Sequence, residues 1–192
     1  MEKNPDATRE KIIAAFLHLY ESRRIEKISI GELTREAGLY RGTFYYYYKD
    51  IYDLLEQLEE RFISEISEVV EHVIDGIFTQ TIEQKVPYFR NYYLSHHQMI
   101  QLFLIGRPNP AVLKKMKENA KKTALTRLGT SLEQLPANGR YIIEYIASAQ
   151  LGLFTLWIEK GQEITPDELA ELIQSVNTSG PLTCLLKEIS NS

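Results

Sequence analysis

Apolar residues recur every three or four positions along most of the chain, which is the spacing of one face of an α-helix. The first such face comprises Ile12, Ile13, Phe16, Leu19 and Tyr20. A longer face extends over about six turns and comprises Leu54, Leu55, Leu58, Phe62, Ile66, Val69, Val70, Val73 and Ile74. The sequence has no alternating apolar–polar run of useful length and no Asn-Gly or Asp-Gly hairpin turn between apolar runs. The pattern predicts an all-α protein.

The second half of the chain is divided by breaks that contain proline or glycine. These breaks are Pro87, residues 107–110, residues 136–139 and residues 161–165. One helix is predicted from about residue 138 to residue 160. A last helix is predicted over residues 166–177, because Thr165 can cap its start and Glu168, three residues later, can complete a capping box.

The composition is that of a soluble globular protein with one domain, or with a small domain joined to a medium-sized one. The chain has 192 residues, of which 44% are hydrophobic and 25% are charged. Its single cysteine, Cys184, excludes an internal disulfide framework and a multi-cysteine zinc site. The first residues are polar, so no signal peptide is expected, and the most apolar stretch, residues 141–158, contains polar side chains unsuited to a membrane span. We therefore expect a cytoplasmic protein without a membrane partner.

The net charge of −4, taken alone, argues against a nucleic-acid partner. The charge is distributed unevenly, however. Residues 1–50 carry nine Lys/Arg and eight Asp/Glu, a balance of +1, whereas the remaining 142 residues carry thirteen and eighteen, a balance of −5. The acidity therefore lies in the last three quarters of the chain and does not exclude DNA binding by the first fifty residues.

Two short helices joined by a glycine turn are predicted within residues 28–55. Ser29 can cap the first of them, with Glu32 three residues later. Gly38 can adopt the left-handed conformation of a tight turn, and the second helix covers residues 41–47. This arrangement is typical of a helix-turn-helix, whose second helix enters the major groove of DNA.

The second short helix has two different faces at about 100° per residue. The residues predicted to point inward are Phe44, Tyr47 and Tyr48. The residues predicted to point outward are Gly42, Tyr45, Tyr46 and Lys49, with Arg41 and Thr43 on the flanks. Gly42 lets the backbone approach DNA closely, Thr43 and the tyrosine hydroxyls can bond phosphate oxygens, and Arg41 can read a guanine edge or bind phosphate. Two alternatives stay open: residues 44–48 also look like a strand, and a helix-turn-helix can serve for packing or protein binding alone.

The first 55 residues or so resemble the DNA-binding domain of the tetracycline-repressor (TetR) family of transcriptional regulators. The elements that carry the resemblance are Thr8-Arg9 with Ile12-Ile13 and Ala15, then Ala37-Gly38-Leu39, Gly42-Thr43-Phe44-Tyr45 and Asp53-Leu54-Leu55. The resemblance implies an N-terminal three-helix DNA-binding domain over residues 1–49 and a larger helical ligand-binding and dimerisation domain over residues 50–192. It implies a homodimer that binds an inverted-repeat DNA operator, most often as a repressor released by a small-molecule inducer.

The resemblance also implies roles for single residues. Phosphate contacts are expected from Thr8, Thr43 and Tyr45, and base contacts from Tyr40, Arg41 and Tyr46. Ser29, Gly42 and Lys49 complete the expected DNA-binding set. The chain departs from the family pattern at Ile51, where a lysine is common, at Tyr40, where a capping serine is frequent, and at Arg24, where a glycine usually ends the first helix. Lys49 is the candidate to replace the missing lysine.

The predicted helix at residues 138–160 is apolar on two faces, so it must be buried on both sides. One face comprises Ile142, Tyr145, Ile146, Ala149, Leu153 and Leu156, and the other comprises Ile143, Ala147, Phe154 and Ile158. We predict that the second face meets a partner chain together with the last helix, in a four-helix bundle across a two-fold axis. The predicted dimer interface is therefore Ile143, Ala147, Phe154, Ile158, Leu169, Leu172, Ile173 and Val176. A buried central helix in a monomer is the alternative.

A ligand pocket is predicted where aromatic residues with polar tips gather. Its candidate residues are Tyr88, Tyr92, His96, Met99, Phe103 and Trp157, with ordinary core packing as the alternative. No metal site is expected, because His96 and His97 are adjacent and point to different sides of a helix. No cofactor and no enzyme activity are expected either, since the sequence contains no HExxH, GxSxG or P-loop pattern. A small-molecule carrier or an enzyme that uses the aromatic pocket is the remaining alternative.

Overall fold

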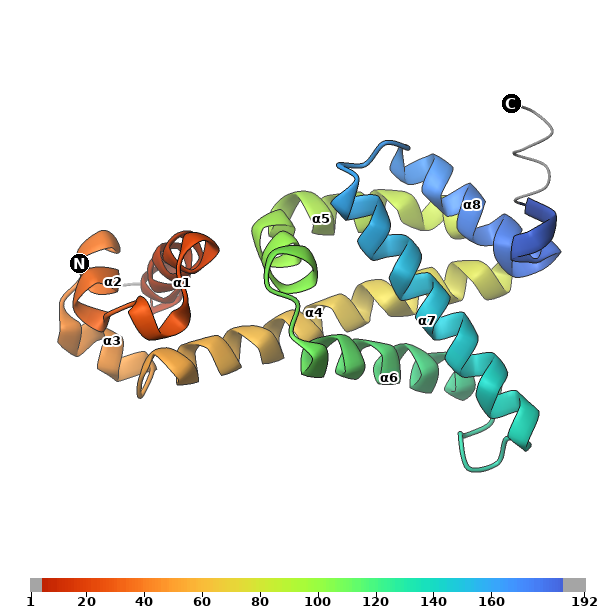
Figure 1. Cartoon of the computed structure of the whole chain (residues 1–192), viewed down its shortest axis with the longest axis horizontal. Helices are drawn as coiled ribbons and strands as arrows, with labels where there is room; N and C mark the ends of the chain where they lie inside the picture. The colour runs from red at the N-terminus through yellow and green to blue at the C-terminus, as the bar shows by residue number, and fades with distance from the viewer. Residues whose placement is uncertain (1–4, 185–192) are drawn as a thin grey trace. The chain divides into compact units, whose positions relative to one another are not determined.

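The computed structural model describes residues 5–184, and these residues form helices without any strand (Figure 1). The α-helices are α1 (Pro5–Ser22), α2 (Ile30–Glu36), α3 (Arg41–Tyr47), α4 (Ile51–Thr79), α5 (Val86–Ile100), α6 (Pro110–Arg127), α7 (Ala137–Glu159) and α8 (Pro166–Ser179). Shorter helical segments are η1 (Ile25–Lys27), η2 (Ile82–Lys85) and the π-helical η3 (Gln101–Gly106). The all-α prediction is confirmed, and the strand alternative for residues 44–48 is wrong.

The chain forms two compact units, Met1–Phe62 and Ile63–Ser192. Helix α4 contributes its first turns to the first unit and its remaining turns to the second. The sequence predicts a change of domain between residues 49 and 50, just before α4 begins at Ile51; this functional boundary stays a prediction. The compact units divide later along the same helix, because Leu54, Leu58 and Phe62 are buried in the core of the first unit.

The core of the first unit contains at least one side chain from each of α1, α2, α3 and α4. Its fully buried members are Ile12, Phe16, Leu33, Phe44, Leu54, Leu58 and Phe62. Helix α2 packs against both α1 and α3. The start of α2 is capped as predicted, since the Ser29 hydroxyl accepts a hydrogen bond from the Glu32 amide at 3.2 Å. Gly38 takes the left-handed conformation, with φ of 66°, in the turn that leads to α3.

The later turns of α4 contribute Ile63, Ile66 and Val69 to the buried residues of the second unit. Helix α7 packs against α6 and η3, and α8 packs against η2 and α5. One core cluster consists of Ile82, Val86 and Ala170, with Val73, Ile77 and Ile173 packed against it. Gly76 permits the close approach of η2 to α4, because a Cβ atom there would lie 2.6 Å from the Cα atom of Ile82.

The last two helices begin close to their predicted starts. The capping box of α8 is present: the Thr165 hydroxyl accepts from the Glu168 amide at 3.2 Å, and the Glu168 carboxylate accepts from the Thr165 amide at 2.7 Å. Helix α5 differs from a regular helix, because His96 has φ of −126° and ψ of 15° and the π-helical turn η3 follows it. No proline or glycine lies at this kink, so local sequence does not indicate it.

Candidate functional site

The outward face of α3 carries a group of exposed aromatic side chains. Tyr40, Tyr45 and Tyr46 are 85%, 57% and 81% exposed. Arg41, Gly42 and Lys49 are also exposed, and Thr43 is half-buried. Tyrosines placed so openly contribute little to the stability of the unit that carries them, so they are candidates for contact with another molecule.

The opposite face of α3 fixes the helix in the first unit. Phe44 and Tyr48 are buried as predicted, whereas Tyr47, also predicted to point inward, is half-buried. The Tyr48 hydroxyl accepts a hydrogen bond from Arg9 Nε at 3.2 Å, and Arg9 Nη2 donates to Gln57 Oε1 at 2.6 Å. Burial raises the pKa of Tyr48, and the Arg9 guanidinium offsets part of that shift. These contacts connect α1 and α4 to the end of α3, so the exposed face is held in one orientation.

The junction between α3 and α4 is held by two aspartates. Asp50 Oδ1 accepts from the amides of Tyr52 and Asp53 at 2.8 and 2.9 Å, which caps α4. Asp53 Oδ2 accepts from the Lys49 amide at 2.7 Å, and this bond, with a further one from Gln57, holds the pKa of Asp53 below its ordinary value. The Ile51 side chain is buried. The position where the family has a lysine therefore serves the core in this chain, while the Lys49 side chain beside it is exposed.

Arg41 lies across the start of α2. A Cβ atom at Gly31 would come 2.3 Å from Arg41 Nη2, so the absence of a side chain at Gly31 makes room for the guanidinium. The guanidinium has no hydrogen bond or ion pair with another residue of the described range 5–184. Its donors are thus available to a phosphate or a guanine edge.

Two of the residues expected to contact DNA differ from those exposed around α3. The side chain of Thr8 is buried in α1. The Ser29 hydroxyl already caps α2. Six of the nine predicted DNA-binding residues are exposed at or beside α3, namely Tyr40, Arg41, Gly42, Tyr45, Tyr46 and Lys49; the roles of all nine stay predictions.

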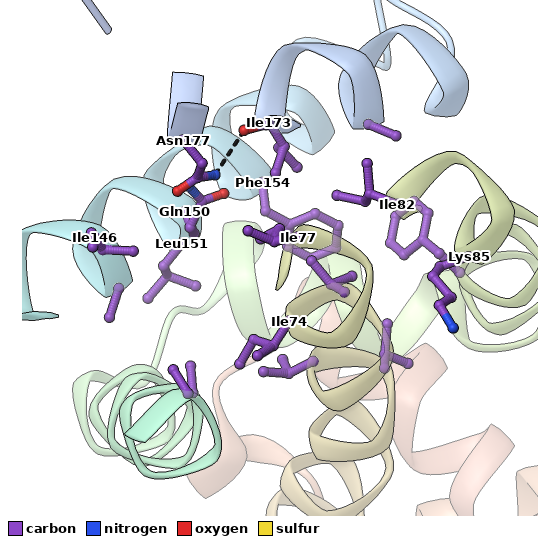
Figure 2. Close-up of a pocket in the computed structure, with 18 of the residues that line it drawn as sticks. Ile74, Ile77, Ile82, Lys85, Ile146, Gln150, Leu151, Phe154, Ile173 and Asn177 are labelled. Atoms are coloured by element: carbon purple, nitrogen blue, oxygen red, sulfur yellow. Dashed lines mark hydrogen bonds between the residues drawn. The ribbon is translucent and has the colours of Figure 1, made fainter. Parts of the chain in front are cut away.

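The second unit contains a cavity of about 340 Å³ between α4, α5, α6, α7 and α8 (Figure 2). Most of its lining is aliphatic or aromatic, including Val69, Val73, Phe89, Ala147, Phe154 and Ile173. The polar residues that reach the lining are Lys85, Lys117, Lys121, Gln150 and Asn177. Its size and apolar walls are those of a site for a small molecule.

None of the six residues predicted to bind ligand lines this cavity. Met99, Phe103 and Trp157 are buried, and Trp157 Nε1 donates to the Ile164 carbonyl at 2.7 Å. The rings of Tyr92 and His96 stack at 4.4 Å, and His96 Nε2 lies 3.3 Å from Glu65 Oε2. The Tyr88 hydroxyl donates to Glu68 at 3.4 Å. These side chains pack and bond within the second unit, as the core-packing alternative expects.

The only sequence feature shared by the residues that line the cavity is the three- and four-residue spacing of a helix face. Val69, Val70 and Val73 were assigned to the apolar face of a long helix, and Ala147 and Ile173 to a dimer interface. The same three- and four-residue spacing describes a helix face in a solid core and a helix face beside a cavity. Sequence reasoning therefore had no signal that separates the two.

The predicted dimer interface lies mostly inside the subunit. Ile143, Ala147, Ile158 and Leu169 are buried in the single chain, and Phe154, Leu172, Ile173 and Val176 are half-buried. The opposite face of α7 is the exposed one: Ile142, Tyr145 and Leu156 are 58%, 58% and 49% exposed. The two apolar faces of α7 are therefore present, one mostly buried within the subunit and one largely exposed, and the dimer interface itself stays a prediction.

A capped helix-turn-helix with an exposed second helix, joined to a helical unit with an apolar cavity, defines a helical DNA-binding regulator as the class of this protein. Residues 80–179 match the TetR family model described as "Transcriptional regulator C-terminal region". Since this match covers more than half of the chain, the protein belongs to the TetR family of transcriptional regulators. The resemblance found in the first 55 residues is thus confirmed.

Comparison with other proteins agrees with this assignment. The HTH-type transcriptional regulator AcrR of Shigella flexneri is 34% identical over 62 residues, which are 32% of this chain and only 29% of that relative. A TetR-family regulator from Streptomyces coelicolor has a similar structure, with a TM-score of 0.63 at 19% identity over 88% of this chain and 78% of the other. FadR of Bacillus subtilis, solved in complex with stearoyl-CoA, has a TM-score of 0.57 at 18% identity over 90% of this chain and 98% of the other. At these identities the two structures show a shared fold.

Proposed function

We propose that the protein is a cytoplasmic homodimeric repressor, without catalytic activity, that binds an inverted-repeat operator and releases it when a small molecule binds the second unit. The observation that supports this most strongly is the exposed face of α3, where three tyrosines, Arg41 and Lys49 surround a glycine. Buried Phe44 and Tyr48 hold that face in place. A surface of flat, hydrogen-bonding side chains with two cations suits the major groove.

In this proposal some residues of α3 and its flanks contact the phosphate groups of DNA, and others contact the edges of the bases. Thr43, Tyr45 and Lys49 contact phosphates, while Tyr40, Arg41 and Tyr46 reach base edges. Gly42 allows close approach to the duplex. Two copies of α3 enter successive major grooves about 34–36 Å apart, so the operator is an inverted repeat.

The second copy is proposed to dock on the exposed apolar face of α7. Ile142, Tyr145 and Leu156 lie on this face together with the small residues Ala149 and Gly152. A Cβ atom at Gly152 would meet nothing within 4 Å in the subunit, so a partner helix has room to approach. Helix α7 is also long and apolar enough, by length and composition, to cross a membrane, but membership of a DNA-binding family favours a second copy as the partner.

Ligand response is proposed from the cavity of the second unit. The FadR neighbour of the same fold was solved with stearoyl-CoA, so this fold accommodates a small-molecule ligand. A ligand can shift the dimer away from DNA only to the extent that it binds the two conformations with different affinities.

The proposed function is tested by selecting duplexes that the full-length protein binds from a random pool. We expect enrichment of an inverted repeat, with an affinity that falls steeply as salt increases because phosphate contacts release counterions. A folded, dimeric protein that enriches no sequence contradicts the proposal. That result favours the alternative, a helical protein-interaction module that has lost DNA binding.

A further inference from the structure

The cavity of the second unit has lysines at its edge, but each ammonium group is already paired with a carboxylate. Lys85 Nζ lies 2.8 Å from Asp75 Oδ2. Lys121 Nζ lies 2.8 Å from Glu118 Oε1 and 2.9 Å from Glu144 Oε2, and Lys117 is paired with Glu144 as well. An anionic ligand would therefore meet lysines whose charge is already balanced by a carboxylate of the protein. The lysine stems, by contrast, add apolar surface to the lining.

The carboxylate that holds two of these lysines stays ionised in any neutral solution. Hydrogen bonds from Lys117 and Lys121 lower the pKa of Glu144 to about 2. Protonation therefore does not release either lysine in the physiological range. The three lysines that line the cavity are each paired with a carboxylate of the protein. The cavity lining formed by the described residues therefore contains no unpaired cation.

One polar group of the lining is left without a partner. Gln150 Oε1 is buried and accepts no hydrogen bond from the described part of the chain. The other amide of the lining, Asn177, donates to the Ile173 carbonyl at 2.7 Å. Figure 2 shows both amides on the α7–α8 side of the cavity lining, with Lys85 on the other side of the view. A buried acceptor without a donor is costly, so a ligand that supplies the donor gains affinity once the Gln150 side chain turns its oxygen toward the cavity.

We propose that the cavity binds a neutral aliphatic alcohol whose hydroxyl donates a hydrogen bond to Gln150 Oε1 and whose chain lies against the apolar walls. This inference rests on the proposed function, in which the second unit binds a small molecule. A hydroxyl suits the site because it is uncharged and can both donate and accept. The cavity has a volume of about 340 Å³. At about 30 Å³ for each water-sized group, it has room for an alcohol with a chain of roughly ten carbon atoms.

Three ligands of nearly equal size test this proposal, because they differ in charge and in the presence of a hydrogen-bond donor. 1-Decanol is neutral and has a donor, 1-methoxynonane is its isomer without a donor, and decanoate is the corresponding anion. Binding is followed through the fluorescence of the chain's one tryptophan, because the Trp157 ring stacks on the ring of Phe154 with centroids 6.2 Å apart and Phe154 lines the cavity. Isothermal calorimetry gives the same constants independently.

For the wild-type protein we expect 1-decanol to bind about fivefold more tightly than 1-methoxynonane, which is the fold-change of roughly one hydrogen bond. Decanoate is expected to bind at least tenfold more weakly than 1-decanol. Decanoate that binds as tightly as 1-decanol overturns the proposal, and so does the absence of saturable binding by the alcohol. These comparisons need no variant.

The Gln150→Leu variant assigns the preference to one side chain. We expect it to bring 1-decanol and 1-methoxynonane to within twofold of each other. The matched control is Gln174→Leu on α8, because the side-chain amide of Gln174 is also buried without a partner in the described chain but does not line the cavity. The control is expected to keep the fivefold preference. A preference that survives in Gln150→Leu overturns the role of Gln150.

The same ligands, titrated into a complex of the protein with its selected duplex, separate this inference from the proposed function. If 1-decanol binds in a Gln150-dependent way but leaves the affinity for the duplex unchanged, the cavity assignment holds and ligand-induced release of DNA is contradicted. If the protein binds the duplex specifically and does not bind 1-decanol, the proposed DNA-binding function is supported and the proposed alcohol site is overturned.

Discussion

Arg41 is the residue whose role in DNA recognition can be assigned most sharply. Its guanidinium lies over Gly31 and has no bonded acceptor within residues 5–184. An arginine in this position either reads a guanine or binds phosphate, and the two roles differ in what they do to sequence preference.

We predict that Arg41→Ala weakens binding to the selected duplex by about 1–3 kcal/mol and relaxes the preference at one base pair. Titration of the variant against a panel of single-base changes in that duplex measures both effects. The control is Arg140→Ala, which removes the same charge from an exposed position in α7 of the second unit. Uniform weakening across the panel would assign Arg41 to a phosphate instead.

Phe44 and Tyr46 are neighbours on α3 with opposite environments, since Phe44 is fully buried and Tyr46 is exposed. We predict that Phe44→Ala destabilises the first unit by about 3–5 kcal/mol because it leaves a cavity in the core. Tyr46→Ala is expected to change stability by no more than about 0.5 kcal/mol while weakening duplex binding. Urea unfolding and duplex titration of both variants separate the two effects; a stable Phe44→Ala protein would contradict the assigned core.

At the scale of elements, helix starts and helix faces were predictable because they depend on local chemistry. Ser29 and Thr165 cap α2 and α8 as their side chains and the following glutamates indicated. The inward Phe44 and Tyr48 followed from spacing alone. These interactions join residues three or four positions apart, so the sequence contains all the information that they need.

The neighbour of each helix was not predictable in the same way. Helix α7 has two apolar faces, and the sequence cannot tell which one packs inside the subunit, because that depends on α6 and η3 folding against it. The cavity was missed for the same reason. The predicted aromatic cluster proved to be packed within the second unit, while the cavity is lined by aliphatic residues that spacing assigns equally well to a core.

Helices α6 and α7 are joined by the contact of Glu144 with Lys117 and Lys121. The folded-state pKa of Glu144, about 2, lies below its ordinary value of 4.5. The contact therefore stabilises the fold fully above about pH 4.5, and this contribution is lost as the pH falls toward 2. We predict that Glu144→Gln lowers Tm at pH 7 and that the difference from wild type disappears near pH 2.

Thermal unfolding of wild type and Glu144→Gln across this pH range measures the effect. The control is Glu71→Gln, an exposed glutamate in α4, which is expected to leave Tm nearly unchanged at every pH. A Glu144→Gln protein with the wild-type Tm at pH 7 would show that the contact does not contribute to stability.

At the scale of the whole molecule, the proposed dimer depends on the exposed face of α7. We predict that Leu156→Arg, which places a charge on that face, converts the protein to a monomer and reduces operator affinity at least tenfold, because each half-site must then bind alone. Leu94→Arg is the matched control, since Leu94 is 65% exposed on α5, outside that face. Sedimentation analysis distinguishes the two; a dimeric Leu156→Arg protein would place the interface elsewhere.

In the proposed complex, two copies of α3 read the two halves of one operator. The most direct test of this arrangement is titration of the full-length protein against three duplexes: the selected inverted repeat, one half-site, and the repeat with five base pairs inserted between its halves. We predict two chains per intact repeat and far weaker binding of both altered duplexes, because the insertion turns the second half-site to the other side of the helix. Equal affinity for all three duplexes would show that the two copies of α3 do not read one operator together.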